Sequence, residues 1–250
     1  MHPPRHSRYQ RLPSRHLGRP VHLWTYGWSG APVLVFPSAA GMAHEWQHSG
    51  AVDALQPWID AGKLRLYCPE TNVSVAWTGE GHPRWRLEQH AAYERFIVDE
   101  LVPRIRQDVG DPAARVATTG CSFGAFYAVN TALKFPQHFH GALGLSGRYR
   151  SSTFMDGHQG HLAYMNQPLA HVAGLSGGDL HAARSVRFTL VAGRGAFEGR
   201  CTQETAEMAH ALGRMGIPTR LDLWGHDVSH EWVWWKRQII HHLPRIAIGR

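Results

Sequence analysis

The sequence predicts an α/β fold in which helices cover both faces of a mainly parallel sheet. Segments with strand and helix patterns alternate along the chain, and this order is typical of parallel sheets. Residues 32–37 and 141–147 are short apolar or small-residue runs bounded by turns, as expected for strands that are buried on both faces. A chain of 250 residues, 43% of them hydrophobic, suffices for one domain with a sizeable core.

The strands are predicted from alternation and from apolar runs. Residues 21–24 alternate between apolar and polar or amphipathic side chains, which favours a strand with one buried face. Residues 114–118 are rich in small and β-branched side chains, and β-branched residues favour strands. The predicted strands are two within residues 9–26, followed by 32–37, 63–68, 114–118, 141–147, 186–192 and 219–224.

The helices are predicted from apolar residues at helical spacing. Residues 88–109 form the longest such pattern, although Pro103 should kink it because proline cannot donate the helical hydrogen bond. Gly216 follows the helix predicted over residues 202–215 and is typical of a helix end. The predicted helices cover residues 52–59, 88–109, 123–133, 202–215 and 231–243.

Three segments follow neither pattern. Residues 1–8 are predicted to form a loose basic arm, and residues 9–250 are predicted to form a single domain. Residues 69–86 predict a loop in which Trp77 and Trp85 are exposed. Residues 148–185, rich in glycine, histidine and aromatic side chains, predict an irregular insertion.

The charge of the chain is basic, with a formal net charge of +7, a pI near 9.7 and 19 histidines. Such a surface attracts anions, including nucleic acids. However, the lysines and arginines are spread along the chain, and no helix-turn-helix, RNP or zinc-finger pattern is present. We therefore predict no nucleic-acid partner. No apolar run approaches the roughly 18 residues of a membrane-spanning helix, so we predict no membrane partner either.

The cysteines indicate the compartment. Cys68, Cys121 and Cys201 are odd in number and far apart, which argues against a disulfide scaffold and favours a reducing environment. The basic N-terminus lacks the apolar stretch of a secretory signal. We expect a cytoplasmic protein.

A candidate nucleophile lies between a predicted strand and a predicted helix. Residues 120–124, Gly-Cys-Ser-Phe-Gly, match the pattern G-x-S-x-G. In a strand–turn–helix context this pattern forms a sharp, strained turn that exposes a serine hydroxyl, and the glycines avoid collisions of a Cβ with neighbouring backbone. Ser122 is therefore predicted to be a nucleophile.

A serine nucleophile needs a base and an orienting acid, which in this architecture follow it in the order acid, histidine. The loop after the last predicted strand contains His226 and His230, and we favour His230 because it directly precedes the closing helix. The loop after the preceding strand offers Glu198 as the acid. Asp222 and Asp227 are the less well placed alternatives.

The tetrahedral intermediate of acyl transfer needs backbone N–H donors for its oxyanion. One is expected from Phe123, the residue after the nucleophile. The other is expected from the small-residue loop after the strand at residues 32–37, where Ala39 is the best candidate and Ser38 its neighbour.

Taken together, these segments resemble the putative-esterase branch of the α/β hydrolases, which includes esterase D-like enzymes and mycolyltransferases. The resemblance rests on residues 36–41 with 45–46, on residues 120–124, and on residues 230–232 with Trp235. It extends from about residue 9 to residue 235 and includes residues 164–168 of the insertion.

The resemblance implies an α/β-hydrolase fold, a Ser-acid-His triad of Ser122, Glu198 and His230, and acyl-ester chemistry. The sequence departs from the family in two places. Cys121 and Phe123 stand where His and Met often flank the serine, and the acid loop lacks the Asp common in relatives.

A competing motif is present at residues 44–48, where His44-Glu45-Trp46-Gln47-His48 matches the zinc-binding pattern H-E-x-x-H. It would make the protein a metallopeptidase. Its extension to a third histidine fails because no histidine follows in register, and Gly41 and Gly50 bracket the segment, which disfavours a long helix. We expect a structural or pocket-lining role and no metal.

The sequence thus predicts a serine carboxylesterase that acts on a small-molecule ester through an acyl-enzyme and needs no cofactor. Acyl transfer to an alcohol, or thioesterase activity, would use the same three residues, and the sequence does not distinguish these reactions from hydrolysis. Zinc peptidase chemistry through His44, Glu45 and His48 is the weaker alternative.

Overall fold

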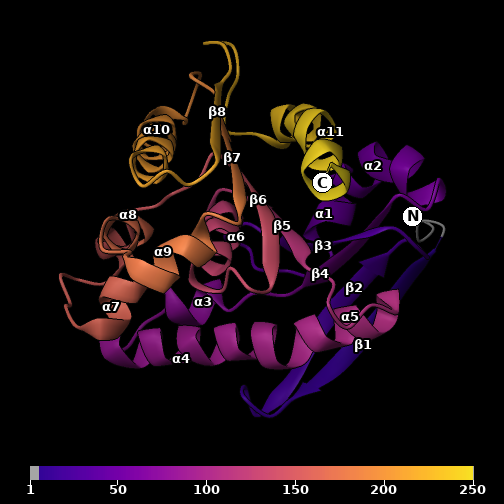
Figure 1. The fold of residues 1–250 in the computed structure, drawn as a ribbon, viewed down its shortest axis with the longest axis horizontal. Coiled ribbons are helices and arrows are strands. Elements are labelled where there is room, and N and C mark those ends of the chain that lie inside the picture. Colours follow the sequence, from indigo (N-terminus) through magenta and orange to yellow (C-terminus); the bar gives the residue numbers. More distant parts are fainter. Residues whose placement is uncertain (1–5, 250) are drawn as a thin grey trace.

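The computed structural model describes residues 6–249, which form one eight-stranded sheet in the order β1-β2-β4-β3-β5-β6-β7-β8 (Figure 1). The strands are β1 Ser7–Ser14, β2 Arg19–Tyr26, β3 Ala31–Phe36, β4 Leu64–Pro69, β5 Val116–Cys121, β6 Phe139–Leu145, β7 Arg187–Ala192 and β8 Thr219–Leu223. The six strands from β4 to β8 are parallel, while β1 and β2 are antiparallel to their neighbours. The mainly parallel sheet predicted from the alternating pattern is confirmed.

Strand β1 begins earlier than the sequence analysis expected. Ser7 pairs with Tyr26 and Arg8 pairs with Thr25 in β2, so these two residues belong to the sheet rather than to a loose basic arm. Pairing of the backbone with a neighbouring strand decides this, and the local basic composition does not reveal it. Residues 1–5 of the expected arm lie outside the described part of the chain.

Helices cover both faces of the sheet (Figure 1). Alternate side chains of β3 show the two layers: Leu34 and Phe36 join the core under α4, α5, α6 and α10, whereas Val33 and Val35 join the core under α1, α2 and α11. The helices are α1 Glu45–His48, α2 Ala51–Asp60, α3 Val73–Ala76, α4 Pro83–Arg95, α5 Val102–Val109, α6 Phe123–Lys134, α7 His161–Met165, α8 Pro168–Ala173, α9 Gly177–Ala183, α10 Gly199–Arg214 and α11 Trp232–Ile248. No helix among the described residues is long and apolar enough to span a bilayer.

The long helical segment predicted at residues 88–109 is interrupted. Helices α4 and α5 are joined by a π-helical stretch, Phe96–Leu101, and Pro103 follows directly in the first turn of α5. Proline offers no N–H to a preceding turn, and a π-helical turn is one way to accommodate that loss within a continuous helix. The irregularity expected from Pro103 is therefore present just ahead of it.

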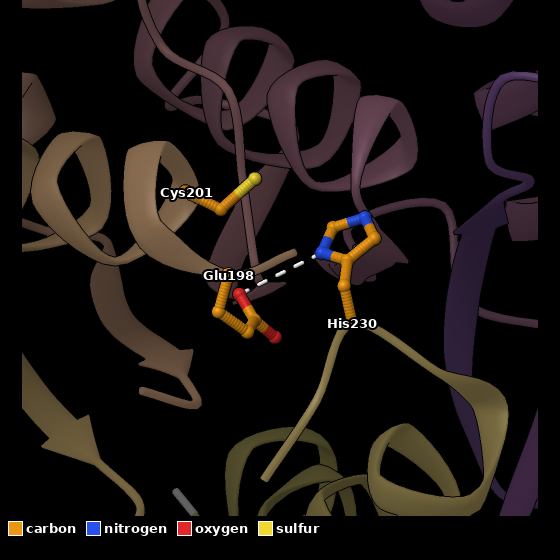
Figure 2. A group of neighbouring side chains, drawn as sticks. All are labelled: Glu198, Cys201 and His230. Atoms are coloured by element: carbon orange, nitrogen blue, oxygen red, sulfur yellow. Dashed lines mark ion pairs between the residues drawn. The ribbon is translucent and has the colours of Figure 1, made fainter. Parts of the chain in front are cut away.

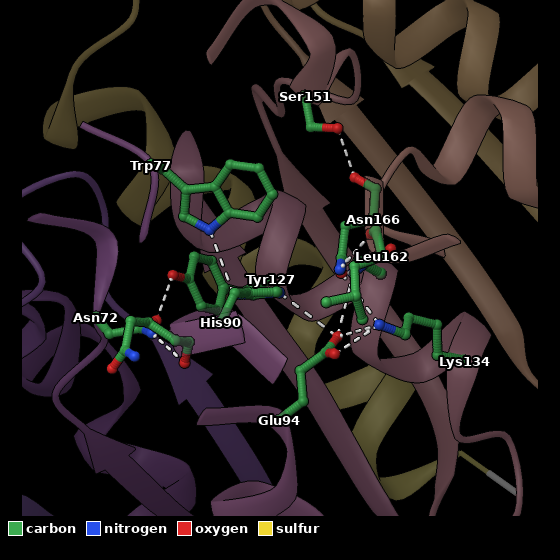
Figure 3. A network of polar contacts seen from close by, with 11 residues as sticks. Asn72, Trp77, His90, Glu94, Tyr127, Lys134, Ser151, Leu162 and Asn166 are labelled. Atoms are coloured by element: carbon green, nitrogen blue, oxygen red, sulfur yellow. Dashed lines mark hydrogen bonds and ion pairs between the residues drawn. The ribbon is translucent and has the colours of Figure 1, made fainter. Parts of the chain in front are cut away.

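The insertion at residues 148–185 is not irregular. It contains the short 3₁₀ turn Ser151–Phe154 and the helices α7, α8 and α9. The Asn166 side chain accepts hydrogen bonds from Asn130 and Lys134 on α6. Its backbone carbonyl accepts one from the Ser151 hydroxyl, and Figure 3 shows Asn166 between Lys134 and Ser151. Contacts to residues distant in sequence hold these short helices, and a local pattern cannot reveal them.

The prediction that Trp77 is exposed is wrong, because its side chain is buried. Its indole N–H donates to His90 Nδ1 on α4 at 3.3 Å (Figure 3), and its ring packs against Phe126. Trp85, by contrast, is exposed as expected. The polar tip of a buried tryptophan usually finds such a partner, so residues 69–86 are more closely packed than a surface loop.

Candidate active site

Ser122 lies in a strained turn between β5 and α6. Its φ of +55° is a conformation that non-glycine residues seldom adopt. Added Cβ atoms at Gly120 and Gly124 would collide with backbone, that of Gly124 itself in the first case and the Phe36 carbonyl in the second. The sharp turn is therefore possible only with glycine at both flanking positions, as the sequence pattern predicts.

Glu198 and His230 face each other across two loops at the carboxyl ends of β7 and β8 (Figure 2). Glu198 Oε2 lies 3.6 Å from His230 Nδ1. Within the described residues neither atom has a hydrogen-bond partner. The Glu198 side chain is fully buried, while that of His230 is 20% exposed. A buried carboxylate oxygen and an imidazole nitrogen without other partners are suited to each other.

Ser146, which the sequence analysis did not assign to the site, holds Glu198 and is itself bonded to Trp235. The Ser146 hydroxyl donates to Glu198 Oε1 at 2.5 Å, and the Trp235 indole N–H donates to the Ser146 hydroxyl at 3.0 Å. The Trp235 ring also packs edge-on against His230, with centroids 4.7 Å apart. The only sequence signal for Ser146 is its position, directly after the buried strand β6 at the same edge as the candidate acid.

The same strand connects this group to Ser122. The Ser122 backbone N–H donates to the carbonyl of Leu145 at 2.8 Å, and Leu145 directly precedes Ser146. Burial raises the pKa of the Cys121 thiol, next to Ser122, and the charges of Glu45 and Glu198 raise it further. The nucleophile candidate and the acid candidate thus lie in one neighbourhood.

The loop expected to supply the second oxyanion donor is held by Glu45. Its carboxylate accepts hydrogen bonds from both the backbone N–H, at 2.6 Å, and the hydroxyl of Ser38. Burial raises the pKa of Glu45, and the two hydrogen bonds from Ser38 oppose that rise. Ala39 follows on the exposed side of this loop. Phe123 lies at the start of α6, beside Gly124, which abuts the carbonyls of Phe36 and Pro37.

The H-E-x-x-H motif does not form a zinc-binding helix of the expected kind. Helix α1 is only four residues long, and the Glu45 carboxylate is engaged by Ser38. The rings of His44 and His48 lie side by side, with centroids 4.3 Å apart. Two groups of three potential metal ligands occur among the described residues, and neither includes His44 or His48.

The alternatives for base and acid lie elsewhere. His226 and Asp227 are exposed. Asp222 pairs with His242 on α11, with Oδ2 and Nε2 3.0 Å apart. Of the two candidate bases, His226 and His230, only His230 has a candidate carboxylate within ion-pair distance of its ring in the described part of the chain.

Comparisons with known proteins give a family and a fold. Residues 82–246 match the esterase family described as "Putative esterase". Among solved structures, a ferulic acid esterase is similar with a TM-score of 0.75 and 17% identity, covering 96% of this chain and 97% of that one. MPT51 of Mycobacterium tuberculosis is similar with a TM-score of 0.72 and 17% identity, covering 97% and 98%.

An S-formylglutathione hydrolase from Agrobacterium tumefaciens is also similar, with a TM-score of 0.72 and 17% identity, covering 96% of this chain and 93% of that one. No curated protein matches the sequence. At these identities the structural matches establish the α/β-hydrolase fold.

Proposed function

Because this chain belongs to the putative-esterase family and is an ester-hydrolysing enzyme of that family, we propose that it is a serine carboxylesterase with the triad Ser122, His230 and Glu198. The observation that carries the proposal is the approach of Glu198 Oε2 to His230 Nδ1, 3.6 Å apart, two atoms without a hydrogen-bond partner among the described residues. This pair lies at the same edge of the sheet as the strained turn of Ser122.

In the proposed reaction, the Ser122 hydroxyl attacks the ester carbonyl and passes its proton to His230 Nε2. His230 then protonates the leaving alcohol, and an acyl group remains on Ser122. Water, deprotonated by the same imidazole, releases the acid. Glu198 accepts a hydrogen bond from Nδ1–H, which keeps Nε2 free to act as the base, and it stabilises the imidazolium. Catalytic hydrogen bonds that are long without substrate tighten in its presence.

The oxyanion would be bound by the backbone N–H groups of Phe123 and Ala39. The Phe123 N–H belongs to the first turn of α6, where the helix dipole also favours negative charge. The hydrogen bonds between Glu45 and Ser38 support this role because they fix the loop that carries Ala39. We propose a small-molecule carboxylic ester as the substrate, and this mechanism requires no cofactor.

The test is the reaction of wild type and Ser122→Ala with a fluorophosphonate, followed by intact mass measurement. We expect one adduct on wild type and none on the variant. We also expect hydrolysis of p-nitrophenyl acetate by Ser122→Ala to fall by at least about 10³-fold, with an unchanged circular dichroism spectrum. A variant that still turns over ester at the wild-type rate would refute the mechanism, and so would the absence of an adduct on both proteins.

A further inference from the structure

A third potential ligand lies beside the Glu198–His230 pair. Cys201 lies in the first turn of α10, three residues after Glu198, so both side chains project from the same side of that turn. The ligand atoms of Glu198, Cys201 and His230 all lie within 4.8 Å of one another (Figure 2). The proposed mechanism does not use the thiol.

We propose that Glu198, Cys201 and His230 form a binding site for a thiophilic divalent cation such as Zn²⁺, and that occupancy of this site inhibits the esterase. The donor set of one sulfur, one imidazole nitrogen and one carboxylate oxygen is that of protein zinc sites. The inference rests on the proposed function, because inhibition follows from the role given to His230.

The distances suit a tetrahedral ion. Zinc bonds to nitrogen and oxygen of about 2.0–2.2 Å place two such ligands about 3.4 Å apart. His230 Nδ1 and Glu198 Oε2 are already 3.6 Å apart. Both atoms are buried and lack a hydrogen-bond partner among the described residues, so coordination would satisfy two polar atoms that the folded chain leaves unpaired.

The charges balance as well. A dication bound by the Glu198 carboxylate and the Cys201 thiolate makes a neutral unit, which lowers the cost of a buried charge. The thiol proton is released to solvent when the metal–sulfur bond forms. The His230 side chain is 20% exposed, so the site lies close to solvent, from which the ion and a water as fourth ligand would come.

The inhibition follows from the tautomer of His230. A metal on Nδ1 leaves the ring proton on Nε2, and that nitrogen can then no longer accept the proton of Ser122. The ion also separates Glu198 from the ring. We therefore expect Zn²⁺ to lower kcat with little change in KM, and EDTA to restore the rate.

The first experiment measures inhibition by Zn²⁺ of wild type, Cys201→Ala, Cys201→Ser and Cys68→Ala, each relative to its own rate in EDTA. Cys68 is also a buried free thiol but lies in the opposite core layer, so Cys68→Ala is the matched control. Replacing one of three ligands should weaken inhibition by at least about tenfold. We expect Cys68→Ala to behave as wild type. Equal inhibition of wild type and both Cys201 variants would overturn the proposal.

The second experiment follows binding without catalysis. Cd²⁺ is titrated into Ser122→Ala, and the ultraviolet thiolate-to-metal charge-transfer band is recorded. We expect one equivalent per chain and loss of the band in Ser122→Ala/Cys201→Ala. A band that persists without Cys201, or no band at all, refutes the metal site while the esterase proposal stands. A Cys201-dependent band in a protein whose wild type hydrolyses no ester refutes the esterase proposal while the metal site stands.

A third experiment, with the variant His241→Ala, tests the competing group of ligands. Asp222, His241 and His242 also lie within 4.8 Å of one another by their ligand atoms. His241→Ala should leave both the Cd²⁺ band and the Zn²⁺ inhibition at wild-type values. Inhibition that disappears in His241→Ala but persists in Cys201→Ala would assign the effect to that second group and overturn the proposal.

Discussion

Ser146 has an unusual backbone conformation for a serine. It is fully buried at the end of β6, and its φ is +51°. Its hydroxyl accepts a hydrogen bond from Trp235 and donates one to Glu198, so its single proton is committed to the candidate acid. Strain of this kind persists where the surroundings determine it, and here it directs one hydroxyl at the candidate acid. We interpret Ser146 as a positioning residue.

We predict that Ser146→Ala lowers kcat by about 10- to 100-fold with little change in KM. A hydrogen bond to a charged group contributes about 1.5–3 kcal/mol, and each 1.4 kcal/mol is about a tenfold change in rate. Steady-state kinetics with a soluble ester give both constants. Trp235→Phe keeps an aromatic ring at this position but removes the N–H donor to Ser146 and the second ring of the indole. Because Ser146 can still donate to Glu198 in this variant, its kcat should fall less. An unchanged kcat in Ser146→Ala would exclude the positioning role.

Glu45 distinguishes the two interpretations of residues 44–48. If Glu45 orders the oxyanion loop through Ser38, then Glu45→Ala should lower kcat by about 10- to 1000-fold, comparable with loss of an oxyanion donor. His48→Ala should have little effect, because the His48 side chain is exposed and the loop is held by the bonds between Glu45 and Ser38. A zinc peptidase would lose activity in both variants. Ester hydrolysis by the two purified proteins decides between these outcomes.

At the scale of elements, local pattern predicted the strands and the turn at Ser122. Buried parallel strands and a strand–turn–helix motif depend on consecutive residues, so the sequence was sufficient to predict them. The hydrogen bonds that hold Glu198 could not be predicted in this way, because Ser146 is 52 residues from Glu198 and 89 from Trp235. For the same reason the short helices of the insertion and the burial of Trp77 could not be predicted.

The buried ion pair between α4 and α6 ties the insertion to the rest of the fold. Lys134 Nζ lies 2.5 Å from Glu94 Oε2 and 3.0 Å from Asn166 Oδ1 in the insertion (Figure 3). Both charged side chains are nearly inaccessible, at 7% and 6% exposure. Burial alone would raise the pKa of Glu94, but Lys134 and His90 lower it to about 2.

We predict that Lys134→Met destabilises the protein by about 3–5 kcal/mol, because it leaves a buried carboxylate without its partner. Urea unfolding followed by tryptophan fluorescence measures this change. The double variant Glu94→Gln/Lys134→Met removes both charges and should recover much of the loss. If the single variant lost less than about 1 kcal/mol, the pair would behave as a surface salt bridge and its structural role would be refuted.

For the whole molecule, the pH dependence of folding stability is set less by the sign of the net charge than by the burial of titrating groups. Burial, helped by the charge of Arg106, lowers the pKa of His138, and burial with the charge of Lys134 lowers that of His171. Both side chains therefore stay neutral in the folded chain at a pH where the unfolded chain binds a proton. Stability is retained above about pH 6.5 and falls as the pH decreases below that value, because the unfolded state takes up more protons.

Glu94 adds a second pH range, below that of the histidines, in which folding stability is lost. Its folded pKa of about 2 lies below the usual value, so its contribution is complete above about pH 4.5 and is lost as the pH falls towards 2. From this carboxylate alone we expect a loss of folding stability on the order of 2 kcal/mol between pH 6 and pH 3.

Urea unfolding curves at pH 7, 5 and 3 test both of these pH ranges. Stability should fall in the first step through the histidines and again in the second through Glu94. Glu94→Gln/Lys134→Met should show a smaller second step, whereas the first step should persist because burial is the largest cause of the lowered pKa values of His138 and His171. A second step of equal size in that double variant would mean that other carboxylates, and not Glu94, set the acid stability of the fold.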